Sequence, residues 1–356
     1  MAAVADTLMR QQVLVQRLAS GEERKFDAFL REIDREIRRR LAGPELTEFA
    51  RARLESLLAA VDDMLAGVFR EYSGQLLLDL QDFAQHEAGV TARALGAAVA
   101  NFEAIVPALV QIRAAVLTNP LGVKGPDGGK LLEGFIRDWT VAERKAVTGA
   151  IRQGVFEGQT NAQIVRRIRG TRARRYADGV LETTARHAHA VVRTAVQHVA
   201  TAARQETFKA NVDIIERVVW ISTLDLRTCV LCASLDQREF PIDKGPRPPA
   251  HPQCRCAVAP RLADEFAFLD EGAKRPAVGP KGGGQVAAGL SYFEWLKKQP
   301  RAFVEEAIGK ARAKLLLDGG LSAGRFAAMN VDKNFLPLTL EGMKRLEPLA
   351  FKRTGL

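Results

Sequence analysis

The sequence lacks several features that mark secreted and membrane-spanning proteins. Cysteine occurs only four times in 356 residues, always between Cys229 and Cys256, whereas a secreted disulfide-rich protein usually spreads its cysteines along the chain. The most apolar stretch, residues 94–117, is interrupted by polar residues such as Glu103 and Arg113, and a spanning helix needs about 20 mostly apolar residues. The first residues also lack the basic start and apolar run of a signal peptide. We therefore expect synthesis in the cytoplasm and no transmembrane segment.

Two motifs of nucleotide-binding enzymes are also missing. The sequence contains neither the Gly-x-x-x-x-Gly-Lys-Ser/Thr phosphate loop nor the Gly-x-Gly-x-x-Gly turn of dinucleotide-binding folds. Aromatic residues make up only 6% of the chain, so its tryptophans are expected to anchor cores rather than to bind ligands. These absences predict a protein that is not an enzyme and has no small-molecule substrate.

The composition that remains is that of a folded, mainly helical protein. Hydrophobic residues make up 47% of the chain, and its length exceeds that of a single hydrophobic core. Apolar residues such as Phe26, Ile33 and Ile37 recur at three- and four-residue steps through the first 118 residues, which predicts successive helices. Capping-box patterns predict further helix starts at Ser20, Thr140, Thr160 and Ser291.

Glycine and proline clusters suggest where the chain divides. Residues 119–129 mark a boundary, and the glycines and prolines of residues 274–284 predict a flexible linker. The β-branched and aromatic run at residues 218–221 is the clearest strand candidate. We predict a helical N-terminal region (1–118), a central domain (119–262), a flexible linker (263–289) and a short helical C-terminal module (290–356).

The cysteines form one cluster with a histidine. A Cys-x-x-Cys pair is followed, after eighteen residues, by a Cys/His group, so the candidates are Cys229, Cys232, His251, Cys254 and Cys256. Two thiolates on one turn and a Cys/His group from a second loop complete the tetrahedron that Zn²⁺ prefers. Four of the five would bind the ion. Cys256 is the weakest candidate, because alternate side chains of an extended segment lie about 6 to 7 Å apart. The fold class is thus mainly α with a small zinc-stabilised β element.

Other interpretations of the cluster stay open. The thiols could be buried and reduced, or form disulfides, whereas a redox Cys-x-x-Cys site normally sits in a βαβ unit, which this chain lacks. A catalytic zinc would need an open position and a base, and Asp236 and Glu239 are available but in no recognised spacing. Asp225 and Arg227 are predicted to play a structural role beside the ligands, through an orienting bond or an ion pair, or as a turn cap in the case of Asp225.

Positive charge is concentrated in one part of the chain. The formal net charge is +10, and residues 161–204 hold nine arginines against only Asp178 and Glu182. The densest group comprises Arg166, Arg167, Arg169, Arg172, Arg174 and Arg175. Arginine pairs phosphate oxygens by charge and by bidentate hydrogen bonds, so these residues predict non-specific contacts with double-stranded DNA. A solvated helix end that binds nothing is the open alternative.

Several motifs together resemble one phage protein family. The pattern Trp220-x₄-Asp225-x-Arg227-Thr-Cys229-x₂-Cys232, with the later Pro-Ala-His251-Pro-x-Cys-Arg-Cys, is similar to the core of phage head morphogenesis proteins of the Mu protein F type. Residues 192–195 resemble the Arg-Thr helix of that family, residues 154–164 its glycine-containing helical hairpin, and residues 292–322 its C-terminal extension. The resemblance covers roughly residues 140 to 340.

The resemblance implies a structural minor capsid protein of a tailed phage. Such a protein would lie in the virion, contact the portal protein, the capsid and the packaged DNA, and act in head assembly or DNA delivery. One alternative is a DNA- or membrane-interacting protein that is ejected with the genome. Another is an enzyme or toxin, which the ordinary C-terminal extension disfavours.

Overall fold

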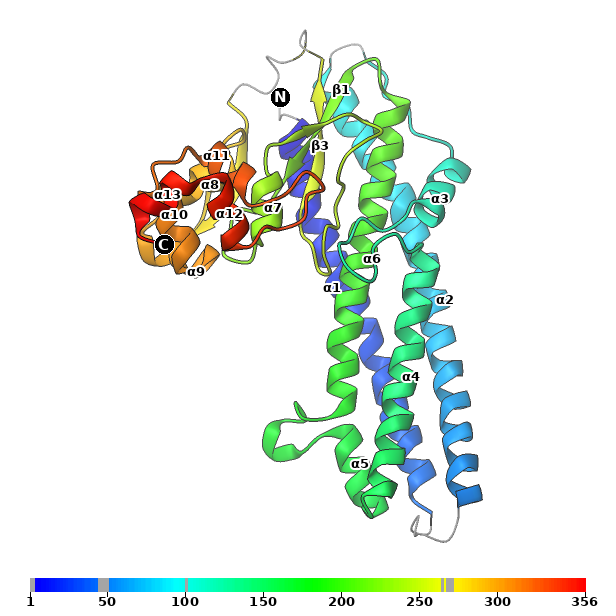
Figure 1. The fold of residues 1–356 in the computed structure, drawn as a ribbon. Coiled ribbons are helices and arrows are strands. Elements are labelled where there is room, and N and C mark those ends of the chain that lie inside the picture. The colour runs from blue at the N-terminus through cyan, green and yellow to red at the C-terminus, as the bar shows by residue number, and fades with distance from the viewer. Residues whose placement is uncertain (1–3, 44–50, 100–101, 264–265, 267–271) are drawn as a thin grey trace.

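The computed structural model describes residues 4–43, 51–99, 102–263, 266 and 272–356. Four long helices run side by side and form an elongated bundle (Figure 1). They are α1 (Val4–Leu41), α2 (Arg51–Ala98), α4 (Leu132–Phe156) and α6 (Val180–Ala210). The short helices α3 (Leu109–Thr118) and α5 (Asn161–Arg169) lie near the upper and lower ends of the bundle. The prediction of a mainly α fold is confirmed.

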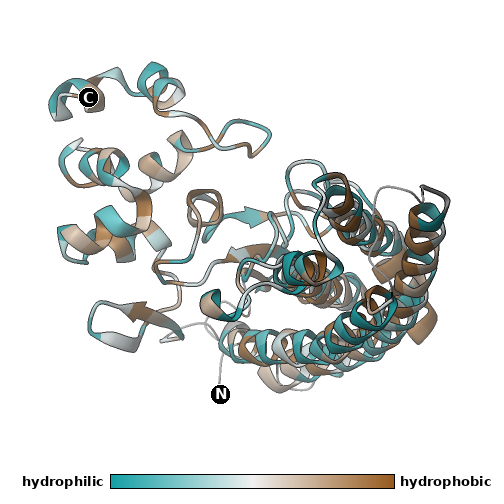
Figure 2. Cartoon of the chain, turned by 90° about the horizontal axis from the view of Figure 1, so that it is seen from below, coloured by the Kyte–Doolittle hydropathy of each residue, from teal (hydrophilic) through white to brown (hydrophobic). Residues whose placement is uncertain are grey.

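The predicted apolar periodicity explains how the bundle packs. Phe26, Ile33 and Ile37 of α1 are each at most 1% exposed, and the ring of Phe26 lies 5.4 Å from that of Trp139 on α4. Polar and apolar residues alternate along the helices (Figure 2). No helix in the described ranges combines the length and the apolar character needed to cross a bilayer.

Two of the four predicted helix starts are wrong. Ser20 and Thr140 lie inside α1 and α4, where their hydroxyls donate to the carbonyls of Gln16 and Arg137. A serine or threonine inside a helix bonds to the preceding turn in this way when the apolar stripe continues past it. Thr160 and Ser291, in contrast, head capping boxes as predicted.

A small antiparallel sheet lies beside the upper end of the bundle (Figure 1). It has the strand order β2-β1-β3, with β1 (Ile215–Ile221), β2 (Glu239–Phe240) and β3 (Ala257–Leu262). The predicted strand is confirmed within β1, whose Trp220 is fully buried opposite Val258 of β3. The six-residue helix α7 (Val230–Leu235) follows β1. The sheet and α7 thus bring the two halves of the Cys/His pattern together.

The prediction of a linker without regular structure is wrong for residues 274–287. These residues form a hairpin of β4 (Lys274–Gly279) and β5 (Gly282–Ala287), and Gly282 turns it with a φ of 103°. The guanidinium of Arg275 is buried and lies 2.8 Å from the carboxylate of Asp236, and Val278 donates to the carbonyl of Leu224. Contacts with distant residues therefore order a segment whose composition favours disorder.

Short helices form the C-terminal module and pack around their own core. That core also contains Leu224 and Ala233 from the central part of the sequence, so the C-terminal module rests on α7. Its helices are α8 (Tyr292–Lys297), α9 (Arg301–Ile308), α10 (Lys310–Asp318), α11 (Ala323–Met329), α12 (Leu340–Leu346) and α13 (Pro348–Thr354).

Candidate metal centre and arginine-rich segment

The five Cys and His residues of the predicted site come together between α7 and the loop before β3. Their ligand atoms form two groups, Cys229–Cys232–His251 and Cys232–Cys254–Cys256, and within each group the atoms lie within 4.8 Å of one another. Cys232 belongs to both groups. The cluster could hold a metal ion.

The local backbone explains how Cys229 and Cys232 are positioned. Cys229 is the N-cap of α7, and its sulfur accepts a hydrogen bond from the backbone N–H of Cys232 at 3.4 Å. The Sγ of Cys232 lies 3.2 Å from Nε2 of His251 and 3.8 Å from Sγ of Cys254. A tetrahedral zinc ion with ordinary bond lengths holds its ligand atoms about 3.5 to 3.8 Å apart. The distance from Cys232 to Cys254 lies in this range, and the distance from Cys232 to His251 is about 0.3 Å shorter than its lower end.

The imidazole of His251 is oriented for metal binding. Its Nδ1 lies 2.8 Å from the carbonyl oxygen of Pro252, which fixes a proton on Nδ1, and its Nε2 faces the sulfurs. Metal-binding histidines are commonly held by a hydrogen bond of this kind. The donor set, one imidazole with several thiols, matches the preference of zinc for nitrogen and sulfur ligands.

The expected separation of Cys254 and Cys256 is wrong. Their sulfurs lie within 4.8 Å of each other rather than at the spacing of an extended segment, because residues 254–256 precede β3 and do not form part of a strand. The thiol of Cys256 lies 3.6 Å from the hydroxyl of Ser222. Cys256 is therefore a geometrically possible ligand.

The thiols and the imidazole shift one another's proton affinity. The hydrogen bond from Cys232, reinforced by His251, lowers the pKa of Cys229 to about 4, against the effect of burial. Hydrogen bonds with Cys229 and Cys254 raise the pKa of His251 to about 11. These two shifts favour a thiolate at Cys229 beside an imidazolium at His251. A divalent cation can replace the imidazolium proton, so metal affinity should increase with pH.

Charged residues beside the cluster are tied into fixed pairs. Asp225 accepts two hydrogen bonds from Arg255, at 2.6 and 2.9 Å, and its Oδ1 also accepts from the backbone N–H of Arg227 at 2.9 Å. The turn-capping alternative for Asp225 is thus the observed geometry. The side chain of Arg227 is exposed, so Arg255 is the ion-pair partner of Asp225.

Neither carboxylate considered as a base for a catalytic metal is free. Asp236 is buried and accepts hydrogen bonds from the backbone of Ser222, from Arg275 and from the backbone of Tyr292, and burial raises its pKa. Glu239 is exposed and faces Arg261 at 3.7 Å across the sheet. Contacts within the protein thus account for the positions of both carboxylates.

A Gly-x-Ser-x-Gly pattern, the spacing of a serine-hydrolase nucleophile, occurs at residues 320–324. A hydrolase places this serine on a turn between a strand and a helix. Here Ser322 follows α10 and accepts a hydrogen bond from the backbone of Arg325 as the N-cap of α11. The serine therefore has a capping role.

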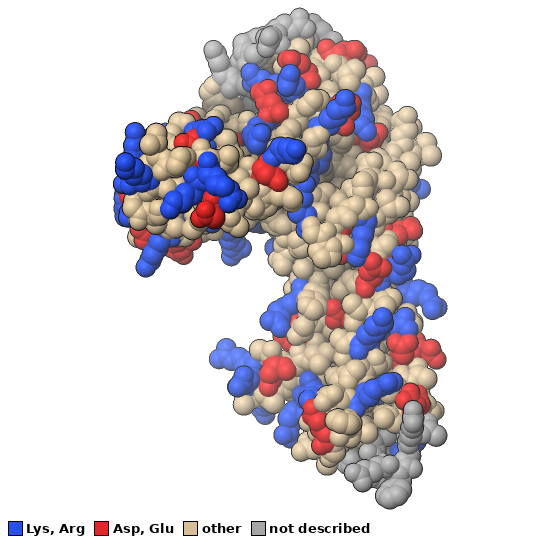
Figure 3. All heavy atoms as spheres, in the orientation of Figure 1, with Lys and Arg blue, Asp and Glu red and all other residues tan. Residues whose placement is uncertain are grey.

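The predicted DNA-binding arginines lie on α5 and on a loop that projects from the lower end of the bundle. Arg167 pairs with Glu157 at 2.9 Å, and Arg169 lies 3.7 Å from Asp34 and stacks over the ring of Tyr176. The remaining four, Arg166, Arg172, Arg174 and Arg175, are exposed and form no ion pair with the described residues. Basic side chains accordingly gather at this projection (Figure 3).

Comparison with known proteins gives one match. The model of the family described as Phage Mu protein F like protein matches residues 145–259. Neither curated proteins nor solved structures provide a match. The matched segment begins within α4 and ends within β3, so it spans both the arginine-rich segment and the Cys/His cluster. The resemblance seen in the sequence motifs is thereby confirmed for residues 145–259, which are similar to the phage Mu protein F like family.

Proposed function

We propose that this protein is a structural minor head protein of a tailed phage, present in the virion and acting in head assembly or DNA delivery without catalysing a reaction. The observation that carries the proposal is the family match, because the matched segment includes both sites described above. We further propose that the portal protein and the capsid are its protein partners. The central domain would extend over residues 119–262, and the C-terminal module over residues 290–356.

Particle composition tests this role. We expect mass spectrometry of purified virions to detect the protein at a few copies per head, and at unchanged copy number in particles emptied of DNA. The major capsid protein in the same samples provides the internal standard. Absence from purified virions would overturn the proposal, whereas loss on DNA release would favour a protein that leaves with the genome.

Zinc is proposed as the ion at the cluster, with Cys229, Cys232, His251 and Cys254 as its ligands and Cys256 as the alternative to one of them. The ligand spacing, the burial of Cys232 and Cys254 and the orientation of His251 support this assignment. A closed site of four protein ligands leaves no open coordination position and contributes to folding. When bound, zinc would cross-link α7 to the loop before β3.

The arginine-rich segment is proposed to contact the backbone of double-stranded DNA. A hollow of about 630 Å³ lies at this segment, and its lining includes the four arginines Arg166, Arg169, Arg172 and Arg174. Three of these, all but Arg169, form no ion pair with the described residues. Asp178 also lines the hollow, but its carboxylate accepts hydrogen bonds from Thr171. Binding through phosphates is insensitive to sequence and depends steeply on salt.

Removing the four unpaired arginines should weaken DNA binding. We expect the quadruple variant Arg166→Ala, Arg172→Ala, Arg174→Ala and Arg175→Ala to bind unrelated duplexes at least about tenfold more weakly at low salt. The slope of log K against log salt should decrease by about 0.9 for each phosphate that the variant no longer neutralises. Filter binding over a salt series measures both quantities.

A second variant controls for the loss of positive charge. Arg70, Arg93 and Arg113 are exposed residues of α2 and α3 that form no ion pair within the described structure, and their replacement by alanine removes three charges far from the segment. We expect this control to retain most of the affinity. Equal losses in both variants would remove the specific role of the arginine-rich segment.

A further inference from the structure

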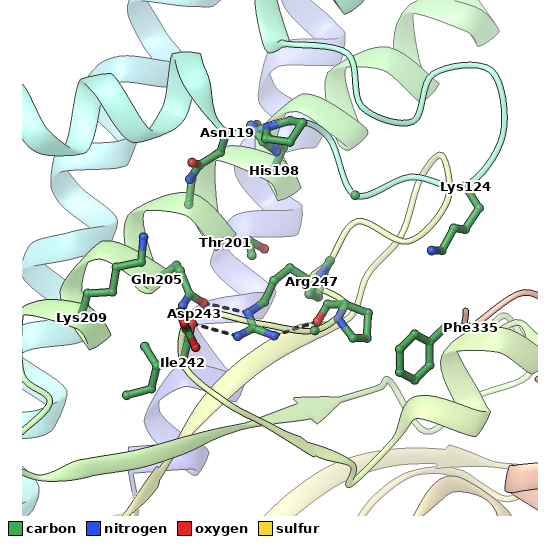
Figure 4. Close-up of a pocket in the computed structure, with 16 residues that line it drawn as sticks. Asn119, Lys124, His198, Thr201, Gln205, Lys209, Ile242, Asp243, Arg247 and Phe335 are labelled. Atoms are coloured by element: carbon green, nitrogen blue, oxygen red, sulfur yellow. Dashed lines mark hydrogen bonds between the residues drawn. The ribbon is translucent and has the colours of Figure 1, made fainter. Parts of the chain in front are cut away.

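A cavity of about 550 Å³ lies between α6 and two loops that are far apart in the sequence (Figure 4). Residues 119–124 form one wall, residues 242–248 form another, and Phe335 of the C-terminal module borders it. The loops are in close contact, since a Cβ atom at Gly122 would lie 2.7 Å from the carbonyl oxygen of Arg247. Pockets that bind ligands usually enclose about 300 to 1,000 Å³, so this cavity has a suitable size.

The guanidinium of Arg247 brings a positive charge to the cavity. Within the described structure, no carboxylate forms an ion pair with it. It donates to the side-chain oxygen of Gln205 at 2.8 Å and to the carbonyl oxygens of Pro241 and Ile242 at 2.7 and 3.0 Å. These acceptors are all neutral. Burial lowers the pKa of Arg247 to about 10, and the negative charge of Asp243 opposes this shift. An anionic group on a ligand would supply the counter-charge that Arg247 lacks.

The other charged groups around the cavity are exposed. The side chains of Lys124 and Asp243 lie on opposite loops, and Lys209 at the end of α6 pairs with Glu206 at 2.6 Å. Asp243 is the only acidic residue among those that line the cavity in the described structure. The balance of charge at the cavity is therefore positive.

A buried histidine adds a hydrogen-bond acceptor. His198 lines the cavity, is only 5% exposed, and its Nε2 lies 3.3 Å from the carbonyl oxygen of Val116. Because the carbonyl can only accept, Nε2 carries the proton and Nδ1 is left as an acceptor without a partner in the described structure. Burial lowers the pKa of His198 to about 4, so the ring is neutral at physiological pH. An N–H or O–H group of a ligand could donate to it.

The surroundings of Phe335 argue against a nucleic acid as the ligand. The residue is held at a φ of 58° by a turn in which Asp332 accepts hydrogen bonds from the backbones of Asn334 and Leu336. The guanidinium of Arg238 lies over the ring, 5.2 Å from its centroid, and Phe240 packs at 5.8 Å. Proteins that bind single strands need open aromatic faces on which bases can stack, and one face of this ring is covered.

From these features we propose that the cavity binds a carboxylate group of an extended polypeptide segment from a partner protein. Arg247 and Lys124 would bind the carboxylate, His198 would accept from a peptide N–H, and the prolines of the two loops would contact the apolar part of the segment. The carboxylate belongs either to the C-terminus of the partner or to an acidic side chain within the partner's segment. The proposal depends neither on the metal nor on DNA binding.

Labelled peptides and the full-length protein provide the test. The probes are Ala-Ala-Pro-Phe with a free C-terminus, the same peptide as its amide, and the amide of Ala-Ala-Pro-Glu, each labelled at the N-terminus with an uncharged BODIPY dye and measured by fluorescence anisotropy. We expect at least one carboxylate-bearing peptide to bind about tenfold more tightly than the neutral amide, since charged hydrogen bonds are roughly twice as strong as neutral ones. Tighter binding of the free C-terminus or of the glutamate peptide identifies the source of the carboxylate.

Substitutions of exposed residues test where the peptide binds without disturbing the fold. Lys124→Glu should weaken binding of the carboxylate peptide about threefold or more, and Asp243→Asn should strengthen it. Lys244→Glu is the matched control, because Lys244 is exposed on the same loop as Asp243 but does not line the cavity, and it should leave the affinity unchanged. The proposal is overturned if no peptide saturates, if the neutral amide binds equally well, if a thymidine tetranucleotide binds more tightly, or if Lys124→Glu has no effect.

Discussion

Replacing Cys232 with serine should abolish stoichiometric zinc binding and lower the midpoint of thermal unfolding by about 10 °C or more. Cys232 belongs to both groups of candidate ligands and is 1% exposed, so no neighbouring thiol can substitute for it. Structural zinc contributes its binding free energy to folding, and a loss of several kcal/mol corresponds to a shift of this size in a protein of more than about 150 residues. Metal analysis and thermal unfolding of the reduced protein measure the two effects.

A pair of variants distinguishes the proposed ligand set from the one in which Cys256 replaces His251. With the proposed set, His251→Asn should lose the metal and Cys256→Ser should keep it, because Cys256 would then only hydrogen-bond to Ser222. If Cys256 is a ligand instead of His251, the result is reversed. Reduced wild-type protein without stoichiometric zinc, or Cys232→Ser protein with a full complement, would contradict the proposed centre.

The second large effect is expected at an ion pair buried in the helical bundle. The side chains of Glu87 on α2 and Arg204 on α6 are both 0% exposed, and they meet at 2.6 Å. Gln11 donates to the second oxygen of Glu87, and Gln12 accepts from Arg204. Glu87→Gln leaves the guanidinium buried without its counter-charge, which costs about 3 to 5 kcal/mol. Denaturant unfolding should show a corresponding decrease in the free energy of unfolding.

An exposed ion pair supplies the matched control. Glu55 and Arg152 lie 3.4 Å apart with side chains 53% and 63% exposed, so Glu55→Gln should change the free energy of unfolding by less than about 1 kcal/mol. Replacing Glu87 by leucine together with Arg204 by methionine should recover most of the stability, because no unpaired charge remains. Similar values for Glu87→Gln and Glu55→Gln would refute the argument.

The helices that depend on local sequence patterns could be predicted from the sequence. The apolar stripe through Phe26, Ile33 and Ile37 predicted the packed face of α1, and the capping box at Thr160 predicted the start of α5. The same type of box failed at Ser20, because a longer apolar stripe continued the helix through it. Local hydrogen-bonding patterns therefore predict a helix start only where the apolar period also begins.

Distant contacts explain what the sequence could not predict. The hairpin at residues 274–287 depends on the pairing of Arg275 with Asp236, which are 39 positions apart. At the candidate centre, the cysteine spacing predicted which residues would meet, whereas the proximity of Cys256 to Cys254 depends on a backbone that becomes a strand only after Cys256. The ion pair between Asp225 and Arg255 likewise requires the tertiary fold.

The length of α6 sets a distance between the two ends of the protein. The helix comprises 31 residues, and a rise of about 1.5 Å per residue makes it roughly 46 Å long. The arginine-rich segment precedes its first turn and the sheet follows its last (Figure 1), whereas the cysteine cluster lies beside its middle, where the backbone N–H of Gln253 donates to the hydroxyl of Thr194. Molecules bound at the two ends would therefore not collide, and the helix would act as a rigid spacer that holds them apart.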